Sequence, residues 1–224
     1  RSIFSSKVRD IMRARRNTRL FLAAEAALYL AFLCCDLRGA FLISTGLKYA
    51  ALLLCLFYSA GNAGSRDGRL VCVALALTAA ADFFLLVLDR WYCLGIALFC
   101  PVQFLYALRL RRMQVSPGPL WPRAVVSGGA LVAFGLSGLL RPLTALICLY
   151  FPQLLYNAAE SLRPSPAHRA PLFRSGLWLF LGCDICVGLH NLAPYLPLSA
   201  ITAAAVQFCM WLLYLPSQVM IALS

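Results

Sequence analysis

Long apolar stretches separated by short polar connectors dominate the chain. The apolar runs cover residues 20–36, 40–60, 69–88, 92–108, 123–140, 142–162, 172–192 and 198–224. Each is close to the roughly 20 residues that an α-helix needs to cross a bilayer. The connectors contain turn-forming residues, as in Gly61-Asn62-Ala63-Gly64 and Ser116-Pro117-Gly118-Pro119. The pattern predicts an all-α, polytopic membrane protein with eight transmembrane helices.

The composition agrees with this class and limits the number of domains. Of the 224 residues, 62% are hydrophobic and 12% are charged, whereas a soluble domain has about 25% charged residues. Eight spans use most of the chain, so we expect one transmembrane domain over residues 20–224. Residues 1–19 are rich in Arg and Lys, which predicts a basic N-terminal segment at the cytoplasmic membrane surface.

The net charge of +12 is placed as in a membrane protein rather than a nucleic-acid-binding protein. With the N-terminus inside, sixteen Lys and Arg residues fall on the inner side of the predicted spans and three on the outer side. This asymmetry predicts that both termini are cytoplasmic. The host membrane would be the inner membrane in a bacterium or the endoplasmic reticulum in a eukaryote.

Three ionisable residues, Lys48, Asp82 and Asp184, lie well inside apolar runs. A charge at mid-bilayer costs about 2.5–3.5 kcal/mol on insertion scales, so such residues are often functional. Counted along their helices at 1.5 Å per residue, the three reach a similar depth, which predicts a shared polar site. The alternative is a structural ion pair with a separate protonated Asp. Glu25 and Glu160 lie nearer the helix ends and carry less weight.

Further polar side chains surround this level of the predicted bundle. Gln103 lies in the fourth run, Tyr150 and Gln153 in the sixth, and Gln207 in the eighth. Intramembrane Gln and Tyr side chains commonly bond across helices. Each can therefore hold helices together or support the site.

Several short motifs follow one another in a fixed order. They are Leu47-Lys48-Tyr49, Ala81-Asp82-Phe83-Phe84-Leu85, the set Gly95, Phe99 and Tyr106, Gly182-Cys183-Asp184, Tyr214-Leu215-Pro216-Ser217-Gln218 and Ile221-Ala222-Leu223-Ser224. In this order and spacing the chain resembles the YhhN-type lysoplasmalogenases, which are eight-helix membrane enzymes. The resemblance extends from the second run to the C-terminus.

The chain departs from that family at three places. Gln103 stands where the family has His, and Ala81 where it has Gly. The stretch from Asp184 to Gln218 is also longer than in the family. Because Gln cannot carry a proton, the chain is either a divergent member with another substrate or an inactive one.

The resemblance implies an activity and roles for individual residues. It implies metal-independent, cofactor-free hydrolysis of the vinyl ether of a lysoplasmalogen, giving a fatty aldehyde and a glycerophospho-headgroup. Asp82 and Asp184 would be the catalytic acid and base, with Asp82 favoured as the acid, since two carboxyls in unlike environments can divide these roles. Lys48 would keep one carboxyl ionised, and Gln103 would orient the water. The supporting residues would be Tyr106, Tyr150, Gln153, Gln207 and Gln218.

Other functions fit the sequence less well, with one exception. A ceramidase-type zinc hydrolase needs several intramembrane His residues, but His168 and His190 lie in or near connectors. The Gly-x-Gly-Asp signature of intramembrane aspartyl proteases is missing around both Asp residues. The main alternative is a non-catalytic lipid-binding or transport protein that uses the same polar site. In either case the expected partners are membrane lipids.

Overall fold

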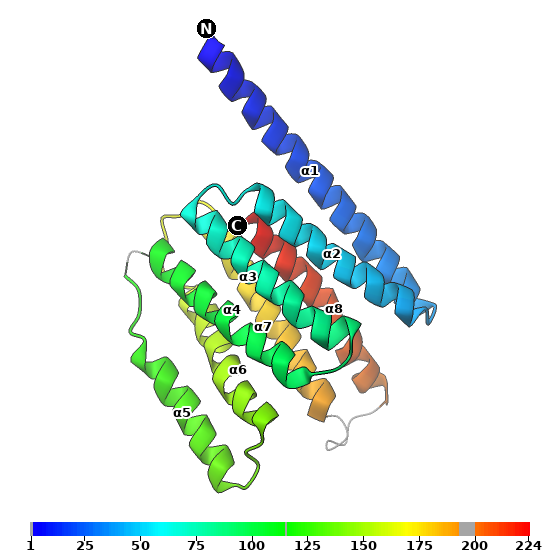
Figure 1. Cartoon of the computed structure of the whole chain (residues 1–224), viewed down its shortest axis with the longest axis vertical. Helices are drawn as coiled ribbons and strands as arrows, with labels where there is room; N and C mark the ends of the chain where they lie inside the picture. Colours follow the sequence, from blue (N-terminus) through cyan, green and yellow to red (C-terminus); the bar gives the residue numbers. More distant parts are fainter. Residues whose placement is uncertain (1, 115, 193–199) are drawn as a thin grey trace. The chain divides into compact units, whose positions relative to one another are not determined.

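The computed structural model describes residues 2–114, 116–192 and 200–224, and these residues form helices and connecting turns. Figure 1 labels the elements. They are α1 Ser2–Leu37, α2 Phe41–Gly61, α3 Arg66–Asp82, the π-helix η1 Phe83–Val87, α4 Tyr92–Met113, α5 Trp121–Leu136, α6 Pro142–Glu160, α7 Ala170–Leu192 and α8 Ala200–Leu223. The all-α class and eight α-helices are thus confirmed for the described residues.

Six of these helices are long and apolar enough to cross a bilayer. They are Met12–Leu37, Phe41–Gly61, Arg66–Val87, Tyr92–Met113, Ala170–Asn191 and Ala204–Leu223. The 16-residue α5 is about 24 Å long, which is less than the roughly 30 Å hydrocarbon core. A multi-pass membrane protein is therefore supported, whereas the full set of eight spans stays a prediction.

The chain divides into two compact units, residues 1–54 and 55–224. In the first unit, α1 continues without a break through the basic segment predicted for residues 1–19. Residues 2–37 contain no Pro or Gly, so nothing in the segment interrupts a helix. A turn at Gly39, whose φ is +73°, connects α1 to α2.

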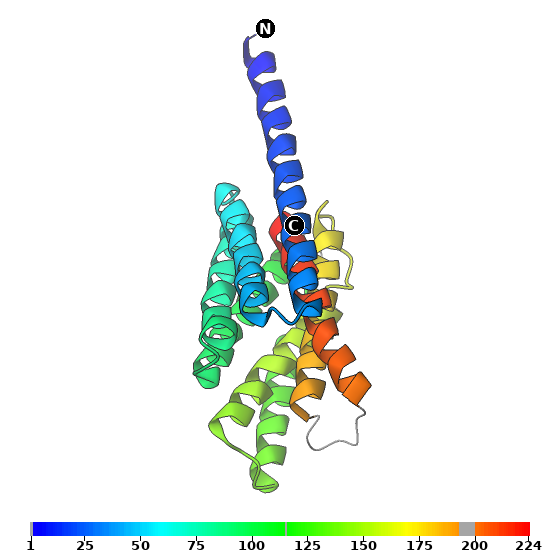
Figure 2. The same cartoon turned by 90° about the vertical axis from the view of Figure 1, so that its right-hand side faces the viewer.

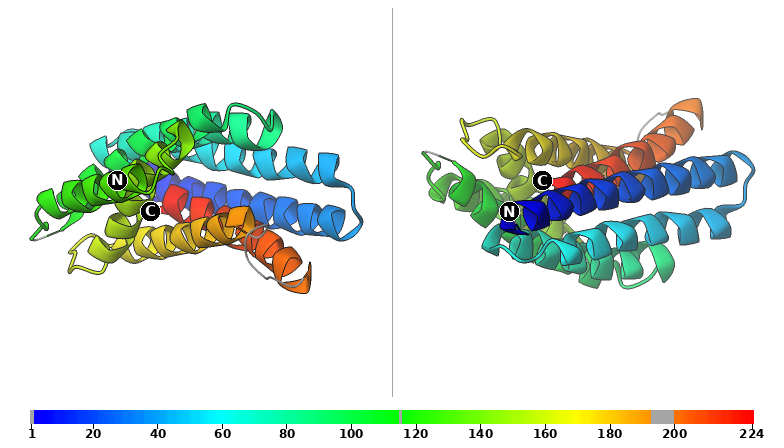
Figure 3. Two further views of the ribbon diagram at one scale, coloured as in Figure 1. Left: turned by 90° about the horizontal axis from the view of Figure 1, so that it is seen from below. Right: turned by 90° about the horizontal axis from the view of Figure 1, so that it is seen from above.

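The second unit is built around a ring of five helices. Around this ring, α3 packs on α4, α4 on α6, α6 on α7, α7 on α8, and α8 again on α3. Helix α5 lies outside the ring and packs on α6 (Figures 1 and 2). The neighbouring pair α7 and α8 is also clear from below and above in Figure 3. Side chains that point inward from all five helices therefore share one interior.

Four of the five ring helices interrupt the regular α-helical pattern. Helix α3 passes directly into the π-helix η1 after Asp82. Helices α4, α6 and α8 each contain an internal proline: Pro101, Pro152 and Pro216. Proline removes one helical N–H donor, and single π-turns inside helices are frequent at functional sites. The interior beside these positions is therefore where we look for a site.

The outer surface of the second unit is apolar. Phe104 and Leu136, for example, are 68% and 86% exposed. Large exposed apolar surfaces mark contact with lipid or with a partner. Such a surface suits a helix bundle that lipid tails surround.

We predict that the connector between α4 and α5 faces the cytoplasm and that the connector between α5 and α6 faces the opposite side. The reason is the uneven distribution of Lys and Arg between connectors. Reporter fusions that ended at residues 117 and 139 would be compared for activity on either side of the membrane. The same location for both reporters, or an external location for residue 117, would contradict the predicted topology.

Candidate functional site

Two carboxyl groups meet inside the ring, from the end of α3 and the middle of α7. Asp82 is buried, and its carboxyl accepts a hydrogen bond from the Tyr214 hydroxyl on α8. Asp184 is half-buried, and its carboxyl interacts electrostatically with the Tyr150 hydroxyl on α6. The two carboxyls are close enough to interact electrostatically. Four helices thus supply one polar centre made of two Asp–Tyr pairs.

Aromatic rings hold the two tyrosines in place. The ring of Phe99 lies 5.7 Å from that of Tyr150 and 5.8 Å from that of Phe180. Phe180 in turn lies 5.8 Å from Tyr214. Edge-to-face contacts at these distances are favourable. The carboxyl pair therefore lies beside a continuous row of packed rings, which fixes the direction of both phenol hydroxyls.

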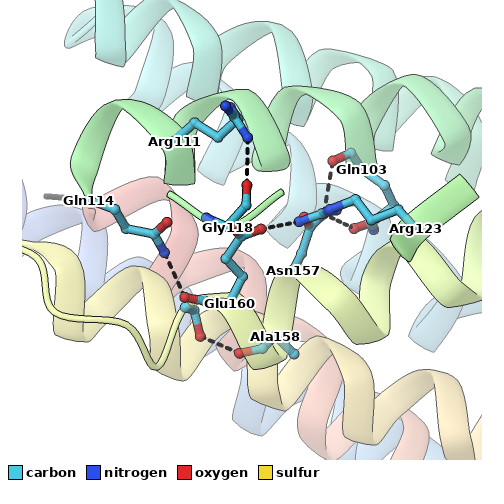
Figure 4. Close-up of polar contacts among 9 residues, drawn as sticks. Gln103, Arg111, Gln114, Gly118, Arg123, Asn157, Ala158 and Glu160 are labelled. Atoms are coloured by element: carbon cyan, nitrogen blue, oxygen red, sulfur yellow. Dashed lines mark hydrogen bonds and ion pairs between the residues drawn. The ribbon is translucent and has the colours of Figure 1, made fainter. Parts of the chain in front are cut away.

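Gln103 is fully buried on α4, in contact with α6. The Asn157 side-chain amide donates to the Gln103 backbone carbonyl at 2.8 Å and to its Oε1 at 3.0 Å. Asn157 Oδ1 in turn accepts from Arg123 of α5 at 2.7 Å. The position that resembles the family's His is therefore the end of a buried polar chain, drawn in Figure 4.

Glu160, at the end of α6, is the centre of that network. Its carboxylate forms a buried ion pair with Arg123 and accepts from the Gly118 N–H at 2.8 Å. Its backbone carbonyl accepts from the Gln114 side chain at 2.6 Å. Arg111 donates to the Gly118 carbonyl at 2.8 Å. These bonds attach the α4–α5 connector to α6 (Figure 4), so Glu160 is a buried structural residue rather than a solvated helix end.

A second ion pair joins the ends of α3, α4 and α8. Arg109 is 1% exposed and donates two hydrogen bonds to the Asp67 carboxylate, at 2.9 and 2.8 Å. It also donates to Ser224 Oγ at 2.6 Å and lies 4.3 Å from the centre of the Phe173 ring. Such a bidentate pair is strong and directional. This end of the bundle is therefore fixed relative to the carboxyl pair.

Lys48 belongs to the first unit and has an ion-pair partner there. Its Nζ lies 2.8 Å from Asp36 Oδ2 and 5.2 Å from the centre of the Phe32 ring. The apolar pattern did not single out Asp36, because that residue lies at the end of the first apolar run rather than inside it. The expected participation of Lys48 in one site with Asp82 and Asp184 stays a prediction.

Of the remaining predicted site residues, some lie near the carboxyl pair and others do not. Tyr106 and Gln218 are buried in the same interior as the carboxyl pair. Gln153 donates to Ser127 Oγ at 3.1 Å and so connects α6 to α5. Gln207 is exposed and lies about 10 Å nearer the start of α8 than Tyr214. The structure thus separates Gln153 and Gln207 from the centre.

Sequence reasoning missed three polar contributors to the interior: Thr78, Asn157 and Tyr214. Tyr214 had a usable signal, since it lies one helical turn before Gln218 on the same helix face. Thr78 likewise lies one helical turn before Asp82 on the same face of α3. Asn157 had none, because its role depends on which helix faces α6.

Among residues 2–114, 116–192 and 200–224, no group of three or more His, Cys, Asp or Glu side chains is placed to hold a metal ion. His190 is exposed near the end of α7. The donor set for a three-ligand zinc centre is thus missing from the described interior.

The fold and the site together define a class: a multi-pass helical membrane protein with a carboxyl pair beside two tyrosine hydroxyls inside its bundle. Residues 43–224 match the model of the YhhN family. This match covers most of the chain, so the protein belongs to the YhhN family, as the motifs indicated. Searches of curated proteins and of solved structures found no match.

We expect Glu160→Gln to destabilise the protein by about 3–5 kcal/mol, because it leaves the buried Arg123 guanidinium without its counter-charge. Thermal unfolding of the purified protein in detergent measures the effect. Arg112→Gln, at an exposed position, is the control and should change stability by less than about 0.5 kcal/mol. Equal stability of the two variants would show that the network contributes little.

Proposed function

We propose that the protein hydrolyses the vinyl ether bond of a lysoplasmalogen-like lipid inside its helix bundle. The observation that carries this proposal is the Asp82–Asp184 pair, in which the Asp82 carboxyl is bonded to the Tyr214 hydroxyl and the Asp184 carboxyl interacts with the Tyr150 hydroxyl. Family membership and the apolar exterior support a lipid substrate. All of the groups in the proposed site are protein side chains, and the chemistry they offer is acid–base catalysis.

The reaction needs an acid that protonates carbon and a base that activates water. In the proposed sequence, one carboxylic acid gives its proton to the vinyl carbon next to the alkyl chain, which leaves an oxocarbenium ion. Water attacks the carbon bonded to oxygen and loses a proton to the other carboxylate. The resulting hemiacetal then breaks its C–O bond: the second carboxyl returns its proton to the leaving oxygen, and the hemiacetal hydroxyl gives its proton to the first carboxylate. This yields a fatty aldehyde and a glycerophospho alcohol and restores both carboxyls to their starting states. Water is the only co-reactant consumed.

We assign the acid to Asp82 and the base to Asp184. Asp82 is the more enclosed of the two, at 6% exposure, whereas Asp184 is half-buried. In this assignment Tyr214 and Tyr150 orient the two carboxyls. A general acid or base typically contributes about 10²–10⁴-fold to a rate. Gln103, whose carboxamide is fixed by Asn157, has a supporting role and transfers no proton.

We expect Asp82→Asn and Asp184→Asn each to lower aldehyde release by at least about 10²-fold. The amide is nearly isosteric but offers neither an acidic proton nor a basic oxygen. The assay uses purified protein in detergent with lysoplasmenyl lipids of several headgroups, with and without a chelator. Thermal unfolding checks that the variants remain folded.

Gln153→Leu, which removes the bond to Ser127 outside the carboxyl pair, serves as the control for general disturbance of the bundle. An inactive parent protein across all headgroups would overturn the proposal. It would favour the alternative, a non-catalytic lipid-binding or transport protein.

Lys48 is proposed as a supporting cation, and its partner Asp36 provides the matched test. If Lys48 also acts on the catalytic carboxyls, Lys48→Met should shift the pH profile of turnover, whereas Asp36→Asn should not. If Lys48 serves Asp36 alone, both variants should lose stability to a similar degree with unchanged pH profiles. Measurements of turnover between pH 5 and 9, together with thermal unfolding, separate the two outcomes.

A further inference from the structure

Three buried polar atoms in the interior that holds the carboxyl pair lack hydrogen-bond partners, although Gln218 donates through its Nε2 to the neighbouring Ser217 Oγ. Within the described part of the chain, Thr78 Oγ1, Tyr106 Oη and Gln218 Oε1 are enclosed and unpartnered. The three residues are 0%, 1% and 0% exposed. More than about nine in ten buried polar groups in proteins are hydrogen-bonded to protein or ordered water. Gln103 Nε2 on α4 is a fourth such atom in the same ring of helices. Several exceptions in one interior therefore call for a ligand.

Two of the three, Thr78 on α3 and Gln218 on α8, lie at the same level on helices that face each other. Asp82 on α3 bonds Tyr214 on α8, whereas Arg109 bonds both Asp67 at the start of α3 and Ser224 after the end of α8. The two helices are therefore antiparallel. Thr78 is four residues before Asp82, and Gln218 is four residues after Tyr214. Each thus lies about 6 Å from the Asp82–Tyr214 bond, toward the same end and on the same helix faces.

Tyr106 reaches this level from α4. Its hydroxyl interacts electrostatically with the hydroxyls of Tyr150 and Tyr214, the two that interact with the catalytic carboxyls. It also lies near the Thr78 hydroxyl, although the two do not reach hydrogen-bond geometry. Its ring packs edge-on against Phe173 at 5.5 Å. The phenol is therefore held beside both Asp–Tyr pairs.

The chemistry of the three atoms defines what they can hold. Gln218 Oε1 is an acceptor, and the Thr78 and Tyr106 hydroxyls can each donate or accept. The three side chains carry no formal charge, so they suit neither a metal ion nor a phosphate. A buried water needs two to four such polar partners. A single hydroxyl-bearing molecule is the ligand that satisfies them.

We propose that Thr78, Tyr106 and Gln218 bind the water that attacks the substrate, an inference that rests on the proposed hydrolysis. The bound water gives its oxygen to the oxocarbenium carbon and its proton to the carboxylate of Asp184, whose Tyr150 partner lies beside Tyr106. The three residues are positioning residues, since they act through the water. The site also explains why this interior keeps polar side chains in a bundle built largely from apolar ones.

The test compares Thr78→Val and Tyr106→Phe, which remove only hydroxyl groups, with Ser44→Ala. Ser44 Oγ is also buried and unpartnered, but it belongs to the first unit. The first measurement is thermal unfolding in detergent, which needs no activity. Loss of a hydroxyl that binds water should lower the Tm by about 2–4 °C, whereas loss of a truly unpaired hydroxyl should leave the Tm unchanged or raise it.

The second measurement is aldehyde release. We expect kcat to fall by about 10- to 100-fold in both variants, with KM within about twofold of the parent, and no change for Ser44→Ala. A substrate without the free glycerol hydroxyl next to the vinyl ether gives the third comparison. If Thr78→Val and Tyr106→Phe have no effect on that substrate, the site takes the lipid hydroxyl and the water assignment is wrong.

An unchanged or higher Tm together with unchanged kcat would overturn the water site altogether. If the parent protein releases no aldehyde, the proposed hydrolysis fails, and the Tm comparison still decides whether these residues bind water. The two proposals can therefore fail independently.

Discussion

The main constraint on this molecule is the cost of keeping carboxyl groups inside an apolar helix bundle. A buried carboxyl needs hydrogen-bond donors, because apolar surroundings offer none. Here the Asp82 carboxyl accepts a hydrogen bond from the Tyr214 hydroxyl, and the Asp184 carboxyl interacts with the Tyr150 hydroxyl. The requirement determines which helices must be neighbours, since the donors come from α8 and α6. The aromatic row through Phe99 and Phe180 then supports the donors.

Charged residues elsewhere in the second unit follow the same rule with stronger partners. Arg109 and Arg123 are both buried, and each has a carboxylate from another segment, Asp67 or Glu160. One pair fixes α3 against α4 and the end of α8, and the other fixes α5 against α6. Within the described part of the second unit, no cation contacts the carboxyl pair of Asp82 and Asp184. The two ion pairs thus stabilise the fold, and the carboxyl pair, which has no described counter-charge in this unit, is the one we propose for proton transfer.

Periodicity and apolar runs predicted most of the fold, since seven of the eight helices fall close to the expected ranges. The exception is α1, because basic side chains do not stop a helix that lacks Pro and Gly. Depth along a helix predicted one level for Asp82 and Asp184, whose carboxyls interact electrostatically in the structure. It could not assign Lys48, because depth says nothing of the direction in which a side chain points, and within the first unit Lys48 pairs with Asp36. Asn157 was beyond reach, since its role depends on which helices face each other.

The helix interruptions described above have a mechanical consequence. The π-helix follows Asp82 directly, while Pro101, Pro152 and Pro216 each lie two residues from Gln103, Tyr150 and Tyr214. A missing ladder bond lets a helix bend at that point. In four of the five ring helices, the segment that bends most easily therefore lies at the depth of the site. Local bending of the wall at this depth would give the proposed lipid substrate a route to the carboxyl pair, while the ion pairs of Arg109 and Arg123 join neighbouring segments at one end of the bundle.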